Sequence, residues 1–150
     1  MSQKARVTYG LHTAGDLYAK LSRDASRLES EVTSDAFFDF AVTACHLPEW
    51  MQSDPSSPGR NRLAMIRRDP NYIVCREIAN ASKHFRVRGS AVASVESEQG
   101  FGIGRFGHGG HGLGEEAIML ELTGGTSLDA LEFIRSLLEL FAPSFALHSS

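Results

Sequence analysis

Residues 34–47 read SDAFFDFAVTACHL, and this stretch indicates a helix packed against a core. Ser34 can cap the helix, and Asp35 suits its first turn because the free amides there carry partial positive charge. Pro48 is expected to stop or kink the helix, with one further turn over residues 49–51 left open, since proline lacks an amide hydrogen. The apolar spacing predicts a wide buried face made by Phe37, Phe38, Ala41, Ala44 and Cys45.

A helix is also predicted on the N-terminal side of this stretch, over residues 14–32. Thr13 and Asp16 have the spacing of a capping box, in which each side chain binds the backbone amide of the other. One apolar stripe runs along this helix, formed by Leu17, Leu21, Leu28 and Val32.

On the C-terminal side, Asp69 and Pro70 open a helix predicted over residues 70–85, because aspartate suits the cap and proline the first helical position. Residues 63–68, LAMIRR, predict a short helical turn before it. The long helix carries a stripe of small residues that would let a neighbouring helix approach closely: Cys75, Ala79 and Ser82.

Residues 87–97 and 115–123 alternate apolar and polar side chains, which predicts an antiparallel pair of strands. A last helix is expected after Gly125, capped by Thr126 and ended by Pro143. The order helix, helix, helix, hairpin, helix predicts a mainly α protein. We expect a four-helix bundle with a β-hairpin inserted before the last helix, an α+β arrangement within a single domain over residues 1–150.

The composition is typical of a water-soluble domain, with 150 residues, 42% hydrophobic and 22% charged. No apolar run approaches the length of about 20 residues that spans a membrane, and residues 1–10 lack the apolar core of a signal peptide. Cys45 and Cys75 lie in apolar helical patterns and are expected to be free core residues. The sequence therefore predicts a cytoplasmic protein that does not bind membranes.

Eight of the 14 glycines lie in residues 100–114, together with His108 and His111. Three of these glycines match G-x-G-x-x-G, but no helix can start directly after them, so a dinucleotide site is not expected and no cofactor is predicted. A long hairpin loop, a metal site using the two histidines, and a loop that orders against a partner remain open. The hypothesis that the loop orders against a partner depends on its apolar residues Phe101, Ile103 and Phe106.

Polar residues at helical spacing mark the two central helices. Asp39, Thr43 and His46 share one face of the second helix. A second set shares a face of the helix over 70–85: Arg76, Asn80, Lys83 and His84. If the two stripes face one another, they form a cleft in which the histidines transfer protons and the cations hold phosphate. The alternative is that both stripes are ordinary solvated faces.

Residues 60–88 hold eight Lys/Arg and two Asp/Glu, a net of 8 − 2 = +6, while the rest of the chain is acidic. This segment could face phosphate or pack against the acidic remainder. Within it, VCREIANASKHF at residues 74–85, with FFDFAVTACHLPEW at 37–50 upstream, resembles a group of small bacterial helical proteins with an Arg-Asn-Lys-His signature on one helix. More distantly, it is similar to HEPN-type helical domains.

The resemblance to HEPN-type domains implies a helical bundle, often a homodimer, with a metal-independent RNase site. It assigns catalysis to Arg76 and His84, with Asn80 between them. The polar stripes add His46 as a proton-transfer candidate and, as substrate-binding candidates, Asn80, Lys83 and Asp39. Without a strong catalytic motif, the sequence leaves three functions open. These are a dimeric protein-interaction or regulatory module, a HEPN-like RNase or nucleotide-binding domain, and a metal-binding protein.

Overall fold

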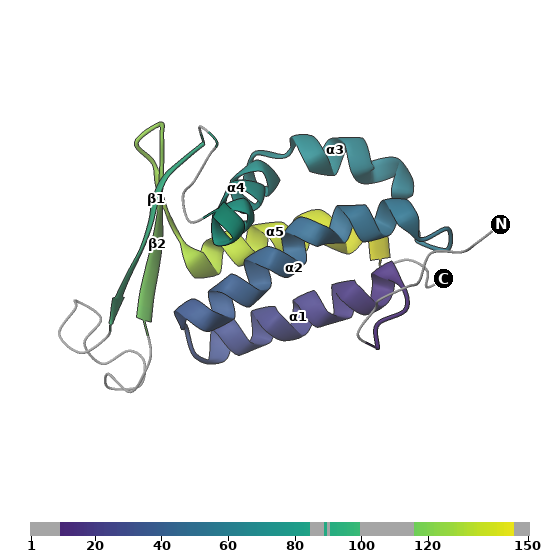
Figure 1. Ribbon diagram of the computed structural model, residues 1–150, viewed down its shortest axis with the longest axis horizontal. Helices are drawn as coiled ribbons and strands as arrows, with labels where there is room; N and C mark the ends of the chain where they lie inside the picture. Colours follow the sequence, from purple (N-terminus) through teal and green to yellow (C-terminus); the bar gives the residue numbers. More distant parts are fainter. Residues whose placement is uncertain (1–9, 85–88, 90, 100–115, 146–150) are drawn as a thin grey trace.

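Two long antiparallel helices, α1 (Ala14–Ser30) and α2 (Ser34–Ser53), form one side of the computed structural model (Figure 1). The structure describes residues 10–84, 89, 91–99 and 116–145, and of these it leaves the side chains of 82–84, 97–99 and 116 undescribed. The capping box at the start of α1 is confirmed: Asp16 N donates to Thr13 Oγ1 at 3.0 Å and Thr13 N donates to Asp16 Oδ2 at 3.2 Å. The backbone hydrogen bonds to Asp16 lower the pKa of its carboxyl group.

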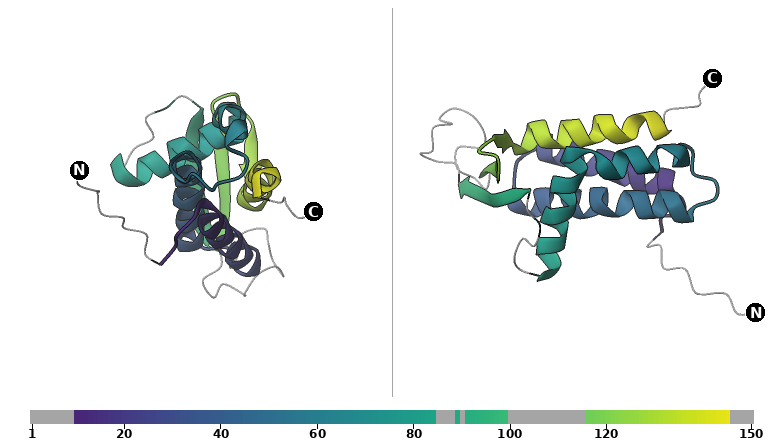
Figure 2. Two further views of the ribbon diagram at one scale, coloured as in Figure 1. Left: turned by 90° about the vertical axis from the view of Figure 1, so that its right-hand side faces the viewer. Right: turned by 90° about the horizontal axis from the view of Figure 1, so that it is seen from above.

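The remaining helices pack around this pair. α5 (Ala130–Phe145) runs alongside α1 and α2, as the view from above shows (Figure 2). α2 leads through a 3₁₀ turn, η1 (Arg60–Arg62), into the short α3 (Leu63–Arg68), which was predicted. α4 (Pro70–His84) then crosses α2 at a steep angle, and Asp69 caps it by accepting a hydrogen bond from Asn71 N at 2.8 Å.

A small antiparallel sheet closes one end of the bundle, with strand order β1-β2-β3. β1 (Val92–Gln99) and β2 (Glu116–Leu122) form the predicted hairpin, with a bulge between Val92 and Ser94. β3 (Ser127–Asp129) extends the sheet and was not predicted. The mainly α, α+β fold class is confirmed, with five helices and three strands among the described residues.

The core lies where α1, α2 and α5 meet, and it extends under the sheet through Ile118 and Leu120. Its largest fully buried side chains come from all of these helices and from the sheet: Phe40, Phe133, Phe141, Leu21, Leu28, Leu47, Met51, Ile66, Leu120, Ile134 and Leu137. A face of every long helix is therefore committed to one continuous apolar interior.

The sheet is fastened to α4 by one carboxylate. Glu77 accepts hydrogen bonds from the backbone amides of Ala91, at 3.0 and 3.1 Å, and of Val92, at 3.0 Å. A β-carbon on Gly89 would overlap the same carboxylate, so an alanine there would displace the Glu77 side chain from this contact. The start of β1 is thus held by a residue of α4 that lies 14 positions before Ala91 and 15 before Val92.

The start of α2 differs from the prediction, and its end settles an alternative that the sequence left open. Thr33, and not Ser34, caps α2, because its Oγ1 accepts from Ala36 N at 3.1 Å. Pro48 lies inside α2, which continues to Ser53. Pro48 leaves the Ala44 carbonyl without its usual helical donor, and the next carbonyl, that of Cys45, accepts a hydrogen bond from Tyr72 Oη at 2.7 Å.

The start and end of the last helix also differ from the prediction. Thr126 does not cap it: the Thr126 carbonyl closes a turn by accepting from Leu122 N at 2.8 Å, and the chain first forms β3. Asp129 caps α5 instead, accepting from Leu131 N at 2.9 Å. Pro143 does not end α5, which runs two residues further, because only one intrahelical hydrogen bond is lost so close to the terminus.

Gly59 should be the glycine least tolerant of substitution. Its φ is +72°, and a β-carbon there would lie 2.5 Å from Ser144 Cβ and 2.7 Å from Ser144 Cα. We expect Gly59→Ala to lower the free energy of unfolding by about 3 kcal/mol, from a left-handed backbone and overpacking against α5. Urea unfolding measures this value.

Two other glycines separate the two causes. Gly125 has a φ of +90° and open space around it, so Gly125→Ala should cost only about 1 kcal/mol. Gly124 has neither constraint, and Gly124→Ala should change stability by less than about 0.5 kcal/mol. Equal losses at Gly59 and Gly125 would contradict the role of the Ser144 contact.

Candidate functional site

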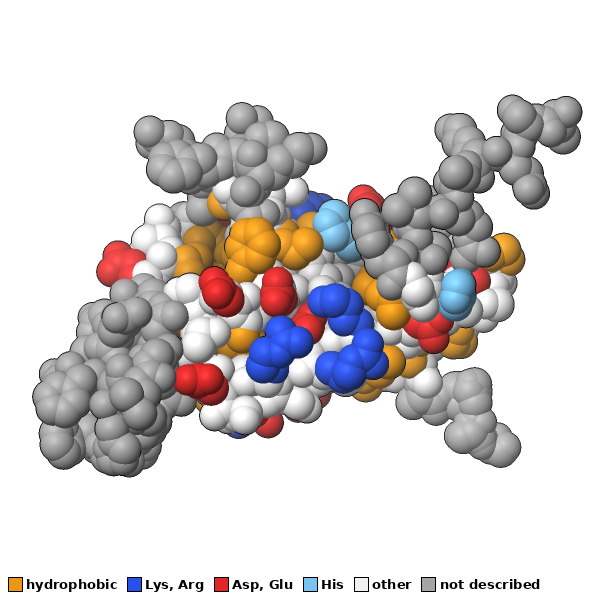
Figure 3. Space-filling view, turned by 60° about the horizontal axis from the view of Figure 1, so that its bottom comes forward, with side chains coloured by type: hydrophobic (Ala, Val, Ile, Leu, Met, Phe, Trp, Pro, Cys, Tyr) orange, Lys and Arg blue, Asp and Glu red, His pale blue; other side chains and the backbone are white. Residues whose placement is uncertain are grey.

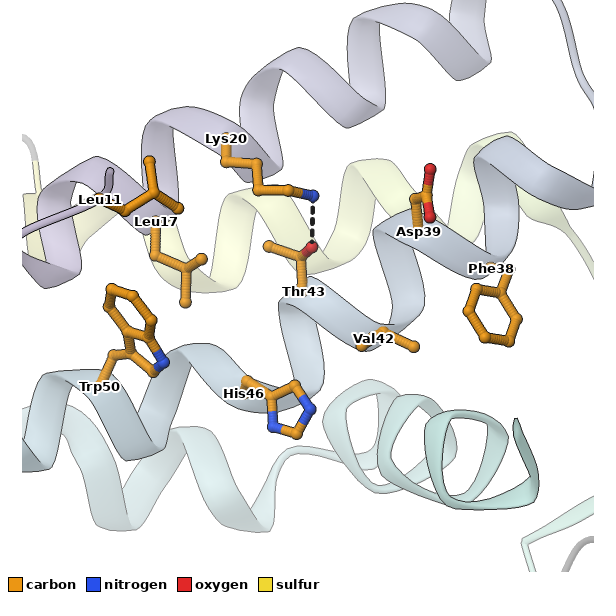
Figure 4. A pocket seen from close by; sticks show the side chains of 9 residues that line it. All are labelled: Leu11, Leu17, Lys20, Phe38, Asp39, Val42, Thr43, His46 and Trp50. Carbon is orange, nitrogen blue, oxygen red and sulfur yellow. Dashed lines mark hydrogen bonds between the residues drawn. The ribbon is translucent and has the colours of Figure 1, made fainter. Parts of the chain in front are cut away.

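An open groove runs along the outer side of the α1–α2 pair. It encloses about 350 Å³. Nine side chains line it, and they are Leu11, Leu17, Lys20, Phe38, Asp39, Val42, Thr43, His46 and Trp50 (Figure 4). The space-filling view onto this side shows hydrophobic side chains gathered beside acidic and basic ones (Figure 3).

The apolar part of the groove follows a ridge on α2. The residues of this ridge are spaced four apart, so they lie along one inclined row on the helix surface: Phe38, Val42, His46 and Trp50. Phe38 is 52% exposed, whereas the sequence predicted it to be buried. Phe37 and Phe40 take the inward positions instead, because α1 and α5 pack on that side of the helix.

The polar part of the groove is a network between α1 and α2. Asp24 is only 2% exposed, and its Oδ2 accepts hydrogen bonds from Lys20 Nζ at 2.7 Å and from Thr43 Oγ1 at 3.2 Å. Lys20 Nζ also donates to Thr43 Oγ1 at 2.9 Å (Figure 4). Arg27 lies 3.6 Å from Asp24 and 3.3 Å from Asp39, so the carboxylates along this seam are neutralised within the domain.

The structure brings the predicted polar stripe of α2 to this groove. Asp39 binds Arg27 and Thr43 binds Lys20, and both partners belong to α1. His46 is exposed in the groove, with Nδ1 3.8 Å from Glu49 Oε1. Asp39 and Thr43 therefore face α1 and His46 is exposed, while the predicted cleft between the polar stripes of α2 and α4 stays a prediction.

The contact between α2 and α4 is made by small and apolar groups. The Cys75 thiol donates to the Ala41 carbonyl at 3.4 Å, and the Tyr72 hydroxyl donates to the Cys45 carbonyl, so the backbones lie close together. Cys75 and Ala79 are buried, as the small-residue stripe predicted.

The predicted site residues of α4 lie elsewhere. Arg76 and Asn80 are exposed, one turn apart on the helix. The side chains of Lys83 and His84 lie outside the described part of the structure. The proposed pairing of Arg76 with His84 therefore stays a prediction.

The metal hypothesis falls on a segment that the structure does not describe, since His108 and His111 lie within residues 100–115. Among the described residues, no group of three or more His, Cys, Asp or Glu side chains could hold a metal ion. Within the same residues, no helix has the length and hydropathy to span a membrane.

No protein-family model, curated protein or solved structure matches this chain. The chemistry of the groove is therefore the best guide to function.

The residues that sequence reasoning missed are Phe38, Val42 and Trp50 as a surface, together with Leu11 and Leu17. One signal was available: apolar residues occupy more of the circumference of α2 than a single buried face requires. Periodicity alone cannot say which part of so wide a face is left uncovered.

Burial of the α2–α4 contact should make stability depend on alkaline pH. Burial raises the pKa of the Cys45 and Cys75 thiols, and it also raises the pKa of the Tyr72 hydroxyl. Above a pH of about 8.5 the unfolded thiols lose protons that the native thiols keep, so the free energy of unfolding should fall as pH rises. The slope should approach about 1.4 kcal/mol per pH unit for each thiol.

Urea unfolding at pH values between about 7 and about 10 measures this slope. Cys75→Ala removes one titrating thiol and should make the slope shallower. A variant that keeps the full slope of the wild-type protein would show that the buried thiols do not cause it.

Proposed function

We propose that this chain is a protein-interaction module whose α1–α2 groove binds an amphipathic helix of a protein partner. The observation that carries the proposal is the exposed apolar ridge of α2. Phe38, which is half-exposed, lies at one end of this ridge, and Trp50 lines the groove at the other end. Large aromatic side chains left at the surface next to a polar rim are typical of protein-binding surfaces.

The shape of the groove favours a helix over a small molecule. It is open and is lined by side chains of α1 and α2, whereas small-molecule sites enclose most of their ligand. A helix with apolar residues three and four apart would lay that face onto Phe38, Val42 and Trp50.

The polar network suits the same role. Lys20, Arg27 and Asp39 are paired inside the domain, so a partner need not neutralise a bare charge in order to bind. Their outer atoms still offer hydrogen-bond donors and acceptors along one rim of the groove, which would fix the orientation of a bound helix. Both cysteines are free thiols, which agrees with our proposal that the protein works in the cytoplasm.

Selection from a displayed library of random peptides tests this function. We expect enrichment of peptides with an i, i+3/i+4 apolar pattern, whose binding changes the fluorescence of Trp50, the single tryptophan of the chain. Phe38→Asp and Val42→Asp should each weaken binding at least about tenfold, because a buried charge would replace an apolar contact.

Met65→Asp is the matched control, since Met65 is 42% exposed on α3, outside the groove. It should bind the selected peptides as the wild-type protein does. Peptides that bind all three variants equally would rule out the groove as their site, and a selection that enriches no helical pattern would contradict the proposed function.

A second candidate is the HEPN-like RNase implied by the sequence resemblance. It is supported by the exposed positions of Arg76 and Asn80, one turn apart on α4. In this proposal His84 transfers a proton and Arg76 stabilises the charge that develops on the phosphate.

Degradation of single-stranded RNA in the presence of a chelator tests this candidate. Arg76→Ala and His84→Ala should each slow cleavage at least about 100-fold, while Arg68→Ala, another exposed arginine, should leave it unchanged. RNA that stays intact with the wild-type protein, or cleavage that survives both substitutions, would eliminate this function.

A further inference from the structure

We infer that a pair of arginine side chains beside the end of α2 binds the phosphate group of a phosphorylated side chain on a protein partner. The residues of this site are Arg60 of η1, Arg67 of α3 and Gln52 in the last turn of α2. None of them lines the α1–α2 groove, so the inference does not rest on the function proposed for that groove.

The two guanidinium groups converge on one residue of α2. Arg60 Nη2 donates to the backbone carbonyl of Gln52 at 3.0 Å, and Arg67 Nη2 donates to Gln52 Oε1 at 2.8 Å. The last turn of α2 and the short α3 lie side by side there (Figure 1). The carbonyl is one of those that a helix end leaves without a helical donor. Two cations are therefore held next to one another by a backbone carbonyl and a neutral amide, and not by a carboxylate.

No acidic residue close in the sequence neutralises this pair. Residues 55–68 contain four arginines and neither aspartate nor glutamate, a net of 4 − 0 = +4 in a chain of net charge −3. The two flanking carboxylates, those of Asp54 and Asp69, accept hydrogen bonds from backbone amides at 2.8 to 2.9 Å. Within the part of the chain that the structure describes, neither Arg60 nor Arg67 forms an ion pair with a carboxylate.

Such a pair has the donors and the charge to bind an anion. Neighbouring like charges repel one another, and an anion that contacts both of them is attracted by each. A guanidinium has five N–H donors in a planar fork, and each of the two arginines uses one of them on Gln52. The other donors can bind the oxygens of one anion in the bidentate manner in which arginine binds phosphate.

A phosphate monoester fits this pair better than a carboxylate or a nucleic-acid strand does. At neutral pH it carries up to about two negative charges and has three acceptor oxygens, so two cations can share it. A carboxylate has one charge, for which one guanidinium is sufficient. A nucleic-acid strand is charged at every nucleotide, and the chain outside residues 60–88, with a net charge of −3 − 6 = −9, would repel it.

The exposure of the pair favours a phosphate that is presented by a protein. Arg60 and Gln52 are exposed, and Arg67 is half-buried. Small molecules bind in pockets that enclose most of their surface. Phosphorylated side chains are instead recognised by clusters of arginine that a partner can reach from outside. The open position of this site therefore suits a phosphorylated segment of a protein.

Titration of the full chain with a short glycine–serine peptide that carries one phosphoserine tests the inference. Nuclear magnetic resonance follows the backbone amides of η1 and α3 and the side-chain Nε–H signals of Arg60 and Arg67. We expect these signals to shift. Phosphorylation should lower the dissociation constant at least about tenfold relative to the unmodified peptide, and a peptide with glutamate in place of phosphoserine should bind at least about fivefold more weakly than the phosphopeptide.

Gln52→Glu is the sharpest variant, because it keeps the shape of the side chain and places a carboxylate beside both arginines. It should weaken phosphopeptide binding at least about tenfold while the chain stays folded, which circular dichroism checks. Arg60→Ala and Arg67→Ala should each weaken binding at least about fivefold. Arg23→Ala is the matched control, since Arg23 is an exposed arginine on α1, and it should bind the phosphopeptide as the wild-type protein does.

Three results would overturn the inference. One is a phosphopeptide that binds no better than the unmodified peptide, and another is binding that Gln52→Glu does not weaken. The third is tighter binding of another anion: a single-stranded oligonucleotide would indicate a nucleic-acid surface, and inorganic phosphate would indicate a site for the free ion. Phe38→Asp should leave phosphopeptide binding unchanged, and Gln52→Glu should leave the binding of helical peptides to the groove unchanged. Failure of this inference is therefore distinguishable from failure of the proposed function.

Discussion

The structure depends on one buried carboxylate, that of Asp24, in the contact between α1 and α2. An ionised carboxylate in an apolar interior costs several kcal/mol unless it is paired and hydrogen-bonded. Its partners come from both helices, Lys20 from α1 and Thr43 from α2. A slip of α2 by one residue would move Thr43 by about 1.5 Å and turn it by about 100°, and the carboxylate would lose its partner on α2. The network therefore selects one register for the helix pair, and the same register places Leu17 beside Trp50 in the groove.

α2 is the central helix of the fold, since it contacts α1, α3, α4 and α5. Its apolar residues nevertheless exceed what these neighbours cover. Phe37 and Phe40 are buried, and Ala41 and Cys45 lie against α4, yet Phe38 projects into solvent. An exposed phenylalanine on such a helix loses hydrophobic free energy of about 2 kcal/mol relative to a buried one. A covering partner would recover that free energy, which is why the ridge is the natural place to look for one.

Much of the fold follows from local patterns in the sequence. The capping box of Thr13 and Asp16, the Asp69–Pro70 start of α4 and the alternation of the two strands all depend on residues close together in the chain, and the structure confirms them. Phe38, β3 and the tie between Glu77 and β1 could not be predicted in this way. Phe38 and the tie depend on which more distant segment lies opposite, and Phe37 and Phe38 are equivalent until the positions of α1 and α5 are known; β3 is local, but its three residues are too few to show a pattern. Gly59 is required by its contact with Ser144, 85 residues later in the chain.

Prediction of the site from the sequence meets the same limit, as the polar stripe of α2 shows. The sequence places Asp39, Thr43 and His46 on one face but does not name the helix that they meet. Small residues on α4, Cys75 and Ala79, let its backbone approach α2 closely. The long side chains of Lys20 and Arg27 can bridge a wider gap, so the stripe turns towards α1. Because the apolar ridge lies next to that stripe on the same helix, the pairing that satisfies the buried carboxylate also gives the exposed ridge its polar border.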